Sequence, residues 1–163
     1  MAERFLDPKK CPVAIDANAL DRDDATRANM VDRLLTLKGA GTINLIVPKG
    51  VRVEIQNPST PSDVQEAALP QIFTMAVGLN SEEQRRKRII EAELRGNAQP
   101  GKHAADADHL FEAGKYGGYF ITYDQRIHKK AGRLGEVLPP SLNVVTLERF
   151  FEIFDNYEAG QRI

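Results

Sequence analysis

Four acidic side chains stand where elements of secondary structure are expected to end or begin, and acids placed in this way can bind a metal ion. Asp16 and Asp124 each follow a short apolar run, Glu54 lies in a short helix expected after another such run, and Asp106 lies in the first turn of an expected helix. Carboxylates gathered in one cleft repel each other, and a divalent cation with oxygen ligands, such as Mg²⁺ or Mn²⁺, removes that conflict. The alternative for any single Asp in such a position is a turn former or a helix cap.

Helix geometry separates Asp106 from its neighbour Asp108. Two residues correspond to about 200° of rotation around a helix, so both side chains cannot point at one metal ion. Asp106 shares a face with Leu110 and Ala113, the face expected to meet a sheet. We therefore predict that Asp106 is the inner ligand and that Asp108 points outward or has a supporting role.

Two smaller polar residues, Asn18 and Thr122, each lie two positions from one of these acids and beside the end of an expected strand. A side chain in such a position can donate a hydrogen bond to a carboxylate and hold its orientation. The alternative for each residue is a hydrogen bond to the local backbone.

The elements that must position these residues alternate between strands and helices. Strands are expected at residues 12–15, 43–47, 119–122 and 142–146. Helices are expected from after Asp24 to about 38, at about 62–79, 81–95 and 103–115, and from 147. Ser81 and Gln84 have the spacing of a capping box at the start of the third of these helices. This alternation predicts a three-layer α/β/α fold around a mostly parallel sheet of about four or five strands. Sites in such folds lie outside the carboxyl ends of the strands.

The length and composition are those of one small domain. The chain has 163 residues and a formal net charge of −1, which argues against a protein that is basic over its whole surface. Residues 57–101 are interpreted as a helical insertion, because they are too few to form an independent core. Neither an apolar run of about 20 residues nor a signal-peptide core is found, so no membrane association and a cytoplasmic location are expected.

The chain resembles PIN-domain proteins in four segments that occur in the family's order. Val13-Ala14-Ile15-Asp16-Ala17-Asn18 resembles the opening motif, and Val51-Arg52-Val53-Glu54-Ile55 resembles the segment that supplies a glutamate. Asp106-Ala107-Asp108-His109-Leu110 resembles the family's Asp-Ala-x-His-Leu helix start, and Tyr119-Phe120-Ile121-Thr122-Tyr123-Asp124 resembles its strand ending in Thr-x-Asp. The last two motifs, whose acids are 18 positions apart, are the most specific.

This resemblance implies a PIN-like fold and a metal-dependent ribonuclease that hydrolyses RNA phosphodiester bonds. It implies metal-site roles for Asp16, Asp106 and Asp124, a catalytic role also for Glu54, and Mg²⁺ or Mn²⁺ as the cofactor. It further implies the toxin half of a toxin–antitoxin pair (VapC-like), a homodimer, and a small antitoxin as partner. Two departures are the length of residues 57–101 and the sequence Gln125-Arg126-Ile127, which lacks a further acid and leaves open whether one or two metals bind.

An enzyme that acts on RNA needs positive charge beside its acidic site. Residues 123–135 contain four basic side chains and one acid, and the four are our candidates for RNA binding: Arg126, Lys129, Lys130 and Arg133. The basic run at 85–88 is interpreted as a solvated helix face, and His109 as a structural residue on the flank of its helix. The competing hypothesis is a PIN-like module that binds RNA or a protein without cleaving.

Overall fold

A five-stranded parallel sheet forms the centre of the computed structural model, which describes residues 5–48, 55, 58–68, 72–73, 79–99, 104–134, 138 and 142–160. Within these ranges the strands are β1 (Pro12–Ile15), β2 (Asn44–Val47), β3 (Ile72–Phe73), β4 (Gly118–Ile121) and β5 (Leu142–Val145). Their order across the sheet is β3-β2-β1-β4-β5, and every neighbouring pair is parallel. A parallel sheet is buried on both faces, which is why these strands are continuous apolar runs.

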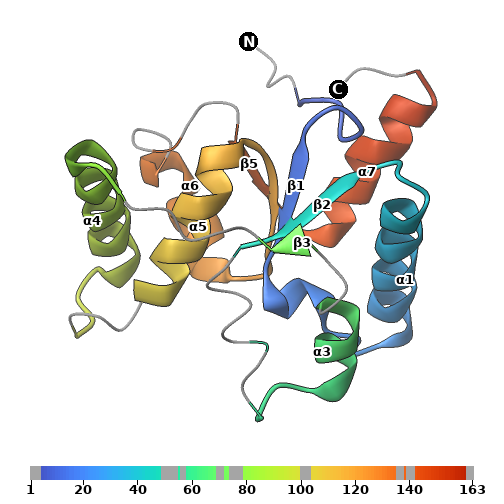
Figure 1. Cartoon of the computed structure of the whole chain (residues 1–163), viewed down its shortest axis with the longest axis horizontal. Helices are drawn as coiled ribbons and strands as arrows, with labels where there is room; N and C mark the ends of the chain where they lie inside the picture. The colour runs from blue at the N-terminus through green and yellow to red at the C-terminus, as the bar shows by residue number, and fades with distance from the viewer. Residues whose placement is uncertain are drawn as a thin grey trace.

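Helices cover both faces of the sheet, so the protein has the three layers expected from its sequence (Figure 1). The described helices are η1 (Ala17–Leu20, a 3₁₀ helix), α1 (Ala25–Gly39), α3 (Ser62–Ala68), α4 (Ser81–Arg95), α5 (Ala104–Tyr116), α6 (Gln125–Leu134) and α7 (Leu147–Glu158). In Figure 1, α1 and α7 lie on one side of the sheet, and α4, α5 and α6 lie on the other. None of the helices in the described part of the chain is long and apolar enough to cross a membrane.

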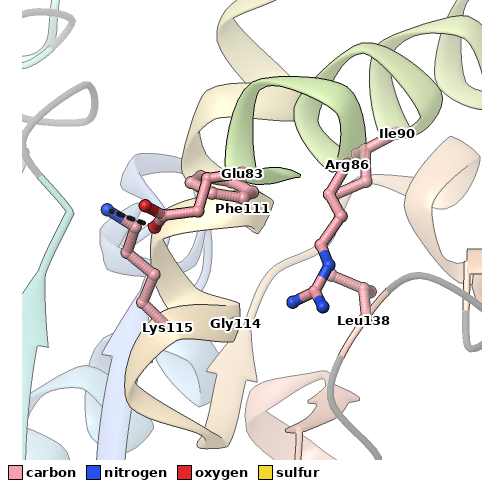
Figure 2. Close-up of a pocket in the computed structure, with 7 residues that line it drawn as sticks. All are labelled: Glu83, Arg86, Ile90, Phe111, Gly114, Lys115 and Leu138. Atoms are coloured by element: carbon pink, nitrogen blue, oxygen red, sulfur yellow. Dashed lines mark ion pairs between the residues drawn. The ribbon is translucent and has the colours of Figure 1, made fainter. Parts of the chain in front are cut away.

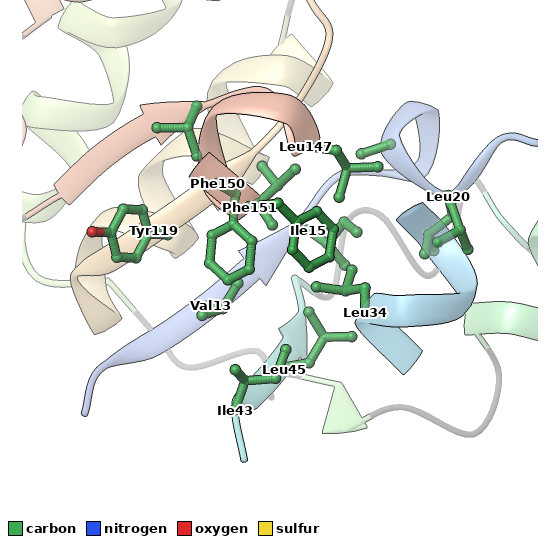
Figure 3. Packing of buried hydrophobic residues seen from close by; sticks show 14 of the residues in the cluster. Val13, Ile15, Leu20, Leu34, Ile43, Leu45, Tyr119, Leu147, Phe150 and Phe151 are labelled. Carbon is green, nitrogen blue, oxygen red and sulfur yellow. The ribbon is translucent and has the colours of Figure 1, made fainter. Parts of the chain in front are cut away.

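Two hydrophobic clusters, one on each face of the sheet, hold the layers together. Val13 and Ile15 of β1 belong to the cluster with α1 and α7, part of which Figure 3 shows, whereas Ala14 belongs to the cluster with α4, α5 and α6. Successive side chains of a strand point to opposite faces, so one four-residue strand supplies both cores. The α/β class and the four longer strands are thus confirmed, with boundaries within about one residue of the prediction.

The helix predicted over residues 62–79 is wrong at residues 72–73, whereas residues 69–71 and 74–78 lie outside the described part of the chain. The helix α3 ends at Ala68, and Ile72–Phe73 form the edge strand β3, which pairs in parallel with β2. In the sequence, Pro70 stands between the two elements, and a residue before proline disfavours the helical conformation. The segment interpreted as a helical insertion therefore also contributes a strand to the sheet.

Two further local features differ from the sequence prediction. The capping box of α4 is formed one residue earlier than predicted, with Asn80 Oδ1 accepting from the backbone N–H of Glu83 at 2.8 Å and Glu83 Oε1 accepting from that of Asn80 at 3.2 Å. Asn and Ser are similarly good caps, so the sequence alone does not choose between them. Helix α6 has no counterpart among the predicted elements, because its large buried apolar side chains, Ile127 and Leu134, stand in a mostly polar stretch.

The turn from α5 into β4 depends on a glycine. Gly118 has φ +77°, and a Cβ atom added there would lie 2.1 Å from the backbone oxygen of Pro12, at the start of β1. We expect Gly118→Ala to lower the free energy of unfolding by about 2–3 kcal/mol, because the new methyl group meets backbone and not a side chain that can move. Urea unfolding followed by circular dichroism measures the loss. Gly39→Ala, a helical position with nothing within 4 Å of the added Cβ, is the control and should be neutral or stabilising. Equal stability of the two variants would contradict this account.

Candidate metal site

The chain topology places a switch point between the carboxyl ends of β1 and β4, and we call the group of side chains at this point the crevice. From β1 the chain proceeds to β2 and β3 on one side, and then crosses to β4 and β5 on the other side. Ligand sites in open parallel sheets lie at such a switch point, outside the carboxyl ends of the two strands. Asp16 directly follows β1, and Thr122 directly follows β4. Pairing continues past both strands, since Asp16 N donates to Ile121 O at 2.9 Å and Thr122 N donates to Val145 O at 3.0 Å.

Asp16 lies at the centre of the crevice and is 6% exposed. Its Oδ1 accepts a hydrogen bond from the backbone N–H of Ala17 at 2.8 Å, which caps η1. Its Oδ2 accepts from Thr122 Oγ1 at 2.9 Å and from Asn18 Nδ2 at 3.3 Å. The side chains at the ends of two strands more than 100 residues apart in the sequence are therefore joined directly at this carboxylate.

Asn18 and Thr122 extend this network toward Asp124. Asn18 Nδ2 also donates to Thr122 Oγ1 at 3.3 Å, and Asn18 Oδ1 accepts from the backbone N–H of Tyr123 at 3.0 Å. Thr122 Oγ1 accepts from the backbone N–H of Asp124 at 3.1 Å. These bonds fix the loop between β4 and α6. His128, one turn into α6, contacts the same loop through Nε2 and Thr122 O at 2.7 Å.

The pKa of Asp16 is raised above its ordinary value, mainly by burial of the carboxyl group. Nearby His109 and the hydrogen bonds from Thr122 and Ala17 oppose this shift, and the negative charge of Asp106 adds to it. The sequence did not connect His109 with the acids. It is 1% exposed, and its Nδ1 lies 3.8 Å from Asp16 Oδ1. Its position three residues after Asp106, on the same helix face, was the available signal.

Asp106 and Asp124 face one guanidinium group. Arg126 Nη1 lies 3.6 Å from Asp106 Oδ2 and 4.0 Å from Asp124 Oδ2. Asp124 directly precedes α6, and its Oδ1 accepts from the backbone N–H of Arg126 at 2.9 Å, the pattern of a helix N-cap. The structure thus assembles Asp106 and Asp124 around a positive charge, with Asp16 close enough to Asp106 for their charges to interact.

Asp108 points to a different neighbour, as the rotation of the helix requires. Its Oδ1 lies 2.5 Å from Lys87 Nζ of α4, away from the crevice. Glu54, predicted as a fourth acid of the site, lies outside the described residues, and the adjacent Ile55 is buried.

The four basic residues of α6 have different surroundings. Arg126 is directed at the acids, whereas Lys130 and Arg133 contact Glu93 in the last turns of α4. Lys130 Nζ donates to the backbone oxygen of Glu93, and Arg133 Nη1 lies 4.0 Å from Glu93 Oε2. Lys129 is exposed. A role for these residues in RNA binding stays a prediction, and Arg126 is the one beside the carboxylates.

The residues present fit a hard divalent cation in chemical type. Within the described ranges, no group of three or more His, Cys, Asp or Glu side chains is arranged to hold a metal ion. Mg²⁺, however, is usually held by one or two carboxylates, with water and substrate phosphate as the other ligands. Asp106 and Asp124 already flank a cationic group, and Asp16 lies beside them with its orientation fixed. Oxygen donors of this kind favour Mg²⁺ or Mn²⁺ over zinc.

A pocket between α4 and α5 lies apart from these acids (Figure 2). It is a partly open pocket lined by Glu83, Arg86, Ile90, Phe111, Gly114, Lys115 and Leu138. Figure 2 shows the Lys115–Glu83 ion pair at its side, with Nζ and Oε2 3.4 Å apart. Its lining residues do not include Asp16, Asp106, Asp124 or Arg126, so we treat this pocket as separate from the carboxylate crevice.

Comparison of the chain with family models, curated proteins and solved structures finds no match. The class of protein is therefore defined by the fold and the site themselves. It is a three-layer α/β protein whose parallel sheet brings an ordered carboxylate, Asp16, to the switch point between its central strands.

Proposed function

We propose that the protein is a Mg²⁺- or Mn²⁺-dependent ribonuclease of the PIN-domain type. The observation that supports this most strongly is the meeting of two separate sequence motifs at one carboxylate. Thr122, from the motif after β4, donates to Asp16, from the motif after β1, at 2.9 Å. Asp106 and Asp124 complete an acidic crevice at the place where an open parallel sheet offers a binding site.

Each residue has a role that follows from its surroundings. A divalent ion bound by Asp16, Asp106 and Asp124 would supply a Lewis acid for the phosphodiester and lower the pKa of a bound water. Thr122, Asn18 and the Ala17 N–H keep the Asp16 carboxylate in one orientation without needing the ion. The exposed positive charge of α6 attracts the RNA backbone toward an otherwise acidic crevice.

The resemblance to PIN-domain toxins extends the proposal to the protein's biology. The protein would be the toxin of a toxin–antitoxin pair, act in the cytoplasm, form a homodimer, and be inhibited by a small antitoxin. Expression of the wild-type chain should then arrest growth, and co-expression of a small protein encoded beside it should restore growth.

The proposed reaction predicts cleavage that depends on a divalent metal. Purified protein with Mn²⁺ should cleave a mixture of single-stranded and structured RNAs to products with 5′-phosphate and 3′-hydroxyl ends, and EDTA should abolish cleavage. Gel analysis of end-labelled RNA measures both results. If the same preparation binds RNA but shows no metal-dependent cleavage, the proposal of a ribonuclease is contradicted. That result would favour a PIN-like module that binds RNA or a protein without cleaving.

A further inference from the structure

Arg126 is the cationic group that the structure brings between two acids of the crevice. Its Nη1 atom faces Asp106 Oδ2 from α5 and Asp124 Oδ2 from the start of α6, at 3.6 Å and 4.0 Å. Its backbone N–H separately donates to Asp124 Oδ1. This backbone hydrogen bond holds Asp124 independently of the position of the Arg126 side chain. A movement of the guanidinium therefore leaves the helix cap intact.

The charge balance explains why a cation lies there. The Oδ2 atoms of Asp106 and Asp124 both lie within 4.0 Å of Arg126 Nη1, and carboxylates gathered in one place repel each other unless a positive charge intervenes. The guanidinium supplies one unit of charge, whereas a divalent ion supplies two in a smaller volume. The guanidinium and a divalent ion are therefore both attracted to the space beside the Oδ2 atoms of Asp106 and Asp124.

The contact is also easily broken. Both Nη1–Oδ2 distances exceed the range of about 2.7–3.2 Å for a normal N–H···O hydrogen bond, so these two contacts rest on charge. The Arg126 side chain is 39% exposed, and ion pairs this accessible to water contribute little stability. These two contacts can therefore be exchanged for contacts with another charged group at little cost.

We propose that Arg126 is an internal counter-ion that competes with the divalent cation for Asp106 and Asp124, and that metal binding releases its guanidinium toward a phosphate of the substrate. This inference rests on the proposed function, since it assumes a metal at these acids. Arg126 has two roles in this scheme: without metal it neutralises the acids, and with metal it offers a planar, charged donor to an incoming phosphate.

The test is Mn²⁺ binding, measured by electron paramagnetic resonance and by the rise of the unfolding temperature with Mn²⁺. Arg126→Gln should bind Mn²⁺ about tenfold more tightly than wild type and show a larger rise, because a competing charge is gone. Arg126→Lys should remain nearer to wild type. Arg33→Gln removes a similarly exposed guanidinium, 43% against 39%, that pairs with Asp155 far from the acids in sequence and leaves the crevice intact. It should bind Mn²⁺ as wild type does.

RNA binding provides the second readout. Arg126→Gln should weaken binding of a non-cleavable RNA in the presence of Ca²⁺ by about tenfold, and Arg126→Lys should restore part of it. If Arg126→Gln fails to fold, Arg126→Met, which retains the apolar stem, allows the same comparison. If Arg126→Gln or Arg126→Met binds Mn²⁺ as wild type does or more weakly, Arg126 does not compete with the metal ion. The proposed metal site would be unaffected by that result. Absence of Mn²⁺ binding by wild type, Arg126→Gln and Arg126→Met alike would overturn both this inference and the proposed metal site.

Discussion

Replacement of Asp16 by asparagine is expected to lower metal-dependent RNA cleavage by about 100-fold or more, with the fold retained. Asparagine has nearly the same shape, and its amide oxygen still accepts a hydrogen bond from Thr122 or from the Ala17 N–H. It lacks the negative charge and the second acceptor, so it is a poor ligand for a hard cation. Asparagine is a better choice than alanine, which would also remove the cap of η1 and leave the Thr122 hydroxyl without its acceptor.

The control for this experiment is Asp32→Asn. Asp32 is an exposed carboxylate on α1 that pairs with Arg22 at 2.7 Å, so its replacement removes the same charge outside the crevice. Cleavage rates under single-turnover conditions, at saturating Mn²⁺, separate loss of chemistry from loss of RNA binding. Full activity of Asp16→Asn with intact metal dependence would exclude Asp16 as a metal ligand. It would thereby contradict the proposed function, which depends on this residue most.

The largest expected effect on stability is that of Phe150→Ala in α7. Phe150 is 0% exposed and forms edge-to-face contacts with Tyr119 at 5.6 Å and Phe151 at 5.5 Å between ring centroids (Figure 3). Deletion of a buried aromatic ring removes its burial energy and leaves a cavity that close-packed neighbours fill only in part. We expect the free energy of unfolding to fall by about 3–5 kcal/mol.

Urea unfolding monitored by circular dichroism checks this value, and the midpoint of thermal unfolding should fall by about 10 °C. Tyr116→Ala is the matched control, because this aromatic side chain, at the end of α5, is 46% exposed and its loss should cost less than about 0.5 kcal/mol. Similar stabilities of the two variants would mean that the α7 face of the sheet is not the packed core that the contacts describe.

The parts of the site that the sequence predicted are those whose position follows from local structure. Asp16 and Thr122 could be placed at strand ends because each follows a short apolar run, and the opposite directions of Asp106 and Asp108 follow from helical rotation alone. The structure agrees: Asp106 faces Arg126, and Asp108 pairs with Lys87 of α4.

The parts that the sequence did not predict depend on contacts between distant segments. The strand β3 has only two residues and exists through its pairing with β2, so no periodicity marks it. The burial of His109 against Asp16 requires α5 to pack on the sheet beside β1. The convergence of Arg126 with Asp106 and Asp124 requires α5 and α6 to begin at the same edge. Apart from the three-residue spacing of Asp106 and His109, none of these features has a signal in a short window of sequence.

The sequence by itself determined the α/β class, the four longer strands and the identity of the acids, because burial on both faces of a parallel sheet demands continuous apolar runs and the polar residues then mark their ends. Only the tertiary structure decided that β1 and β4 are neighbours, since strand order depends on which strand edges pair and not on order in the chain. That neighbourhood joins Asp16 to Thr122, 106 residues later, and turns separate acidic positions into one crevice with Arg126 between two of its carboxylates.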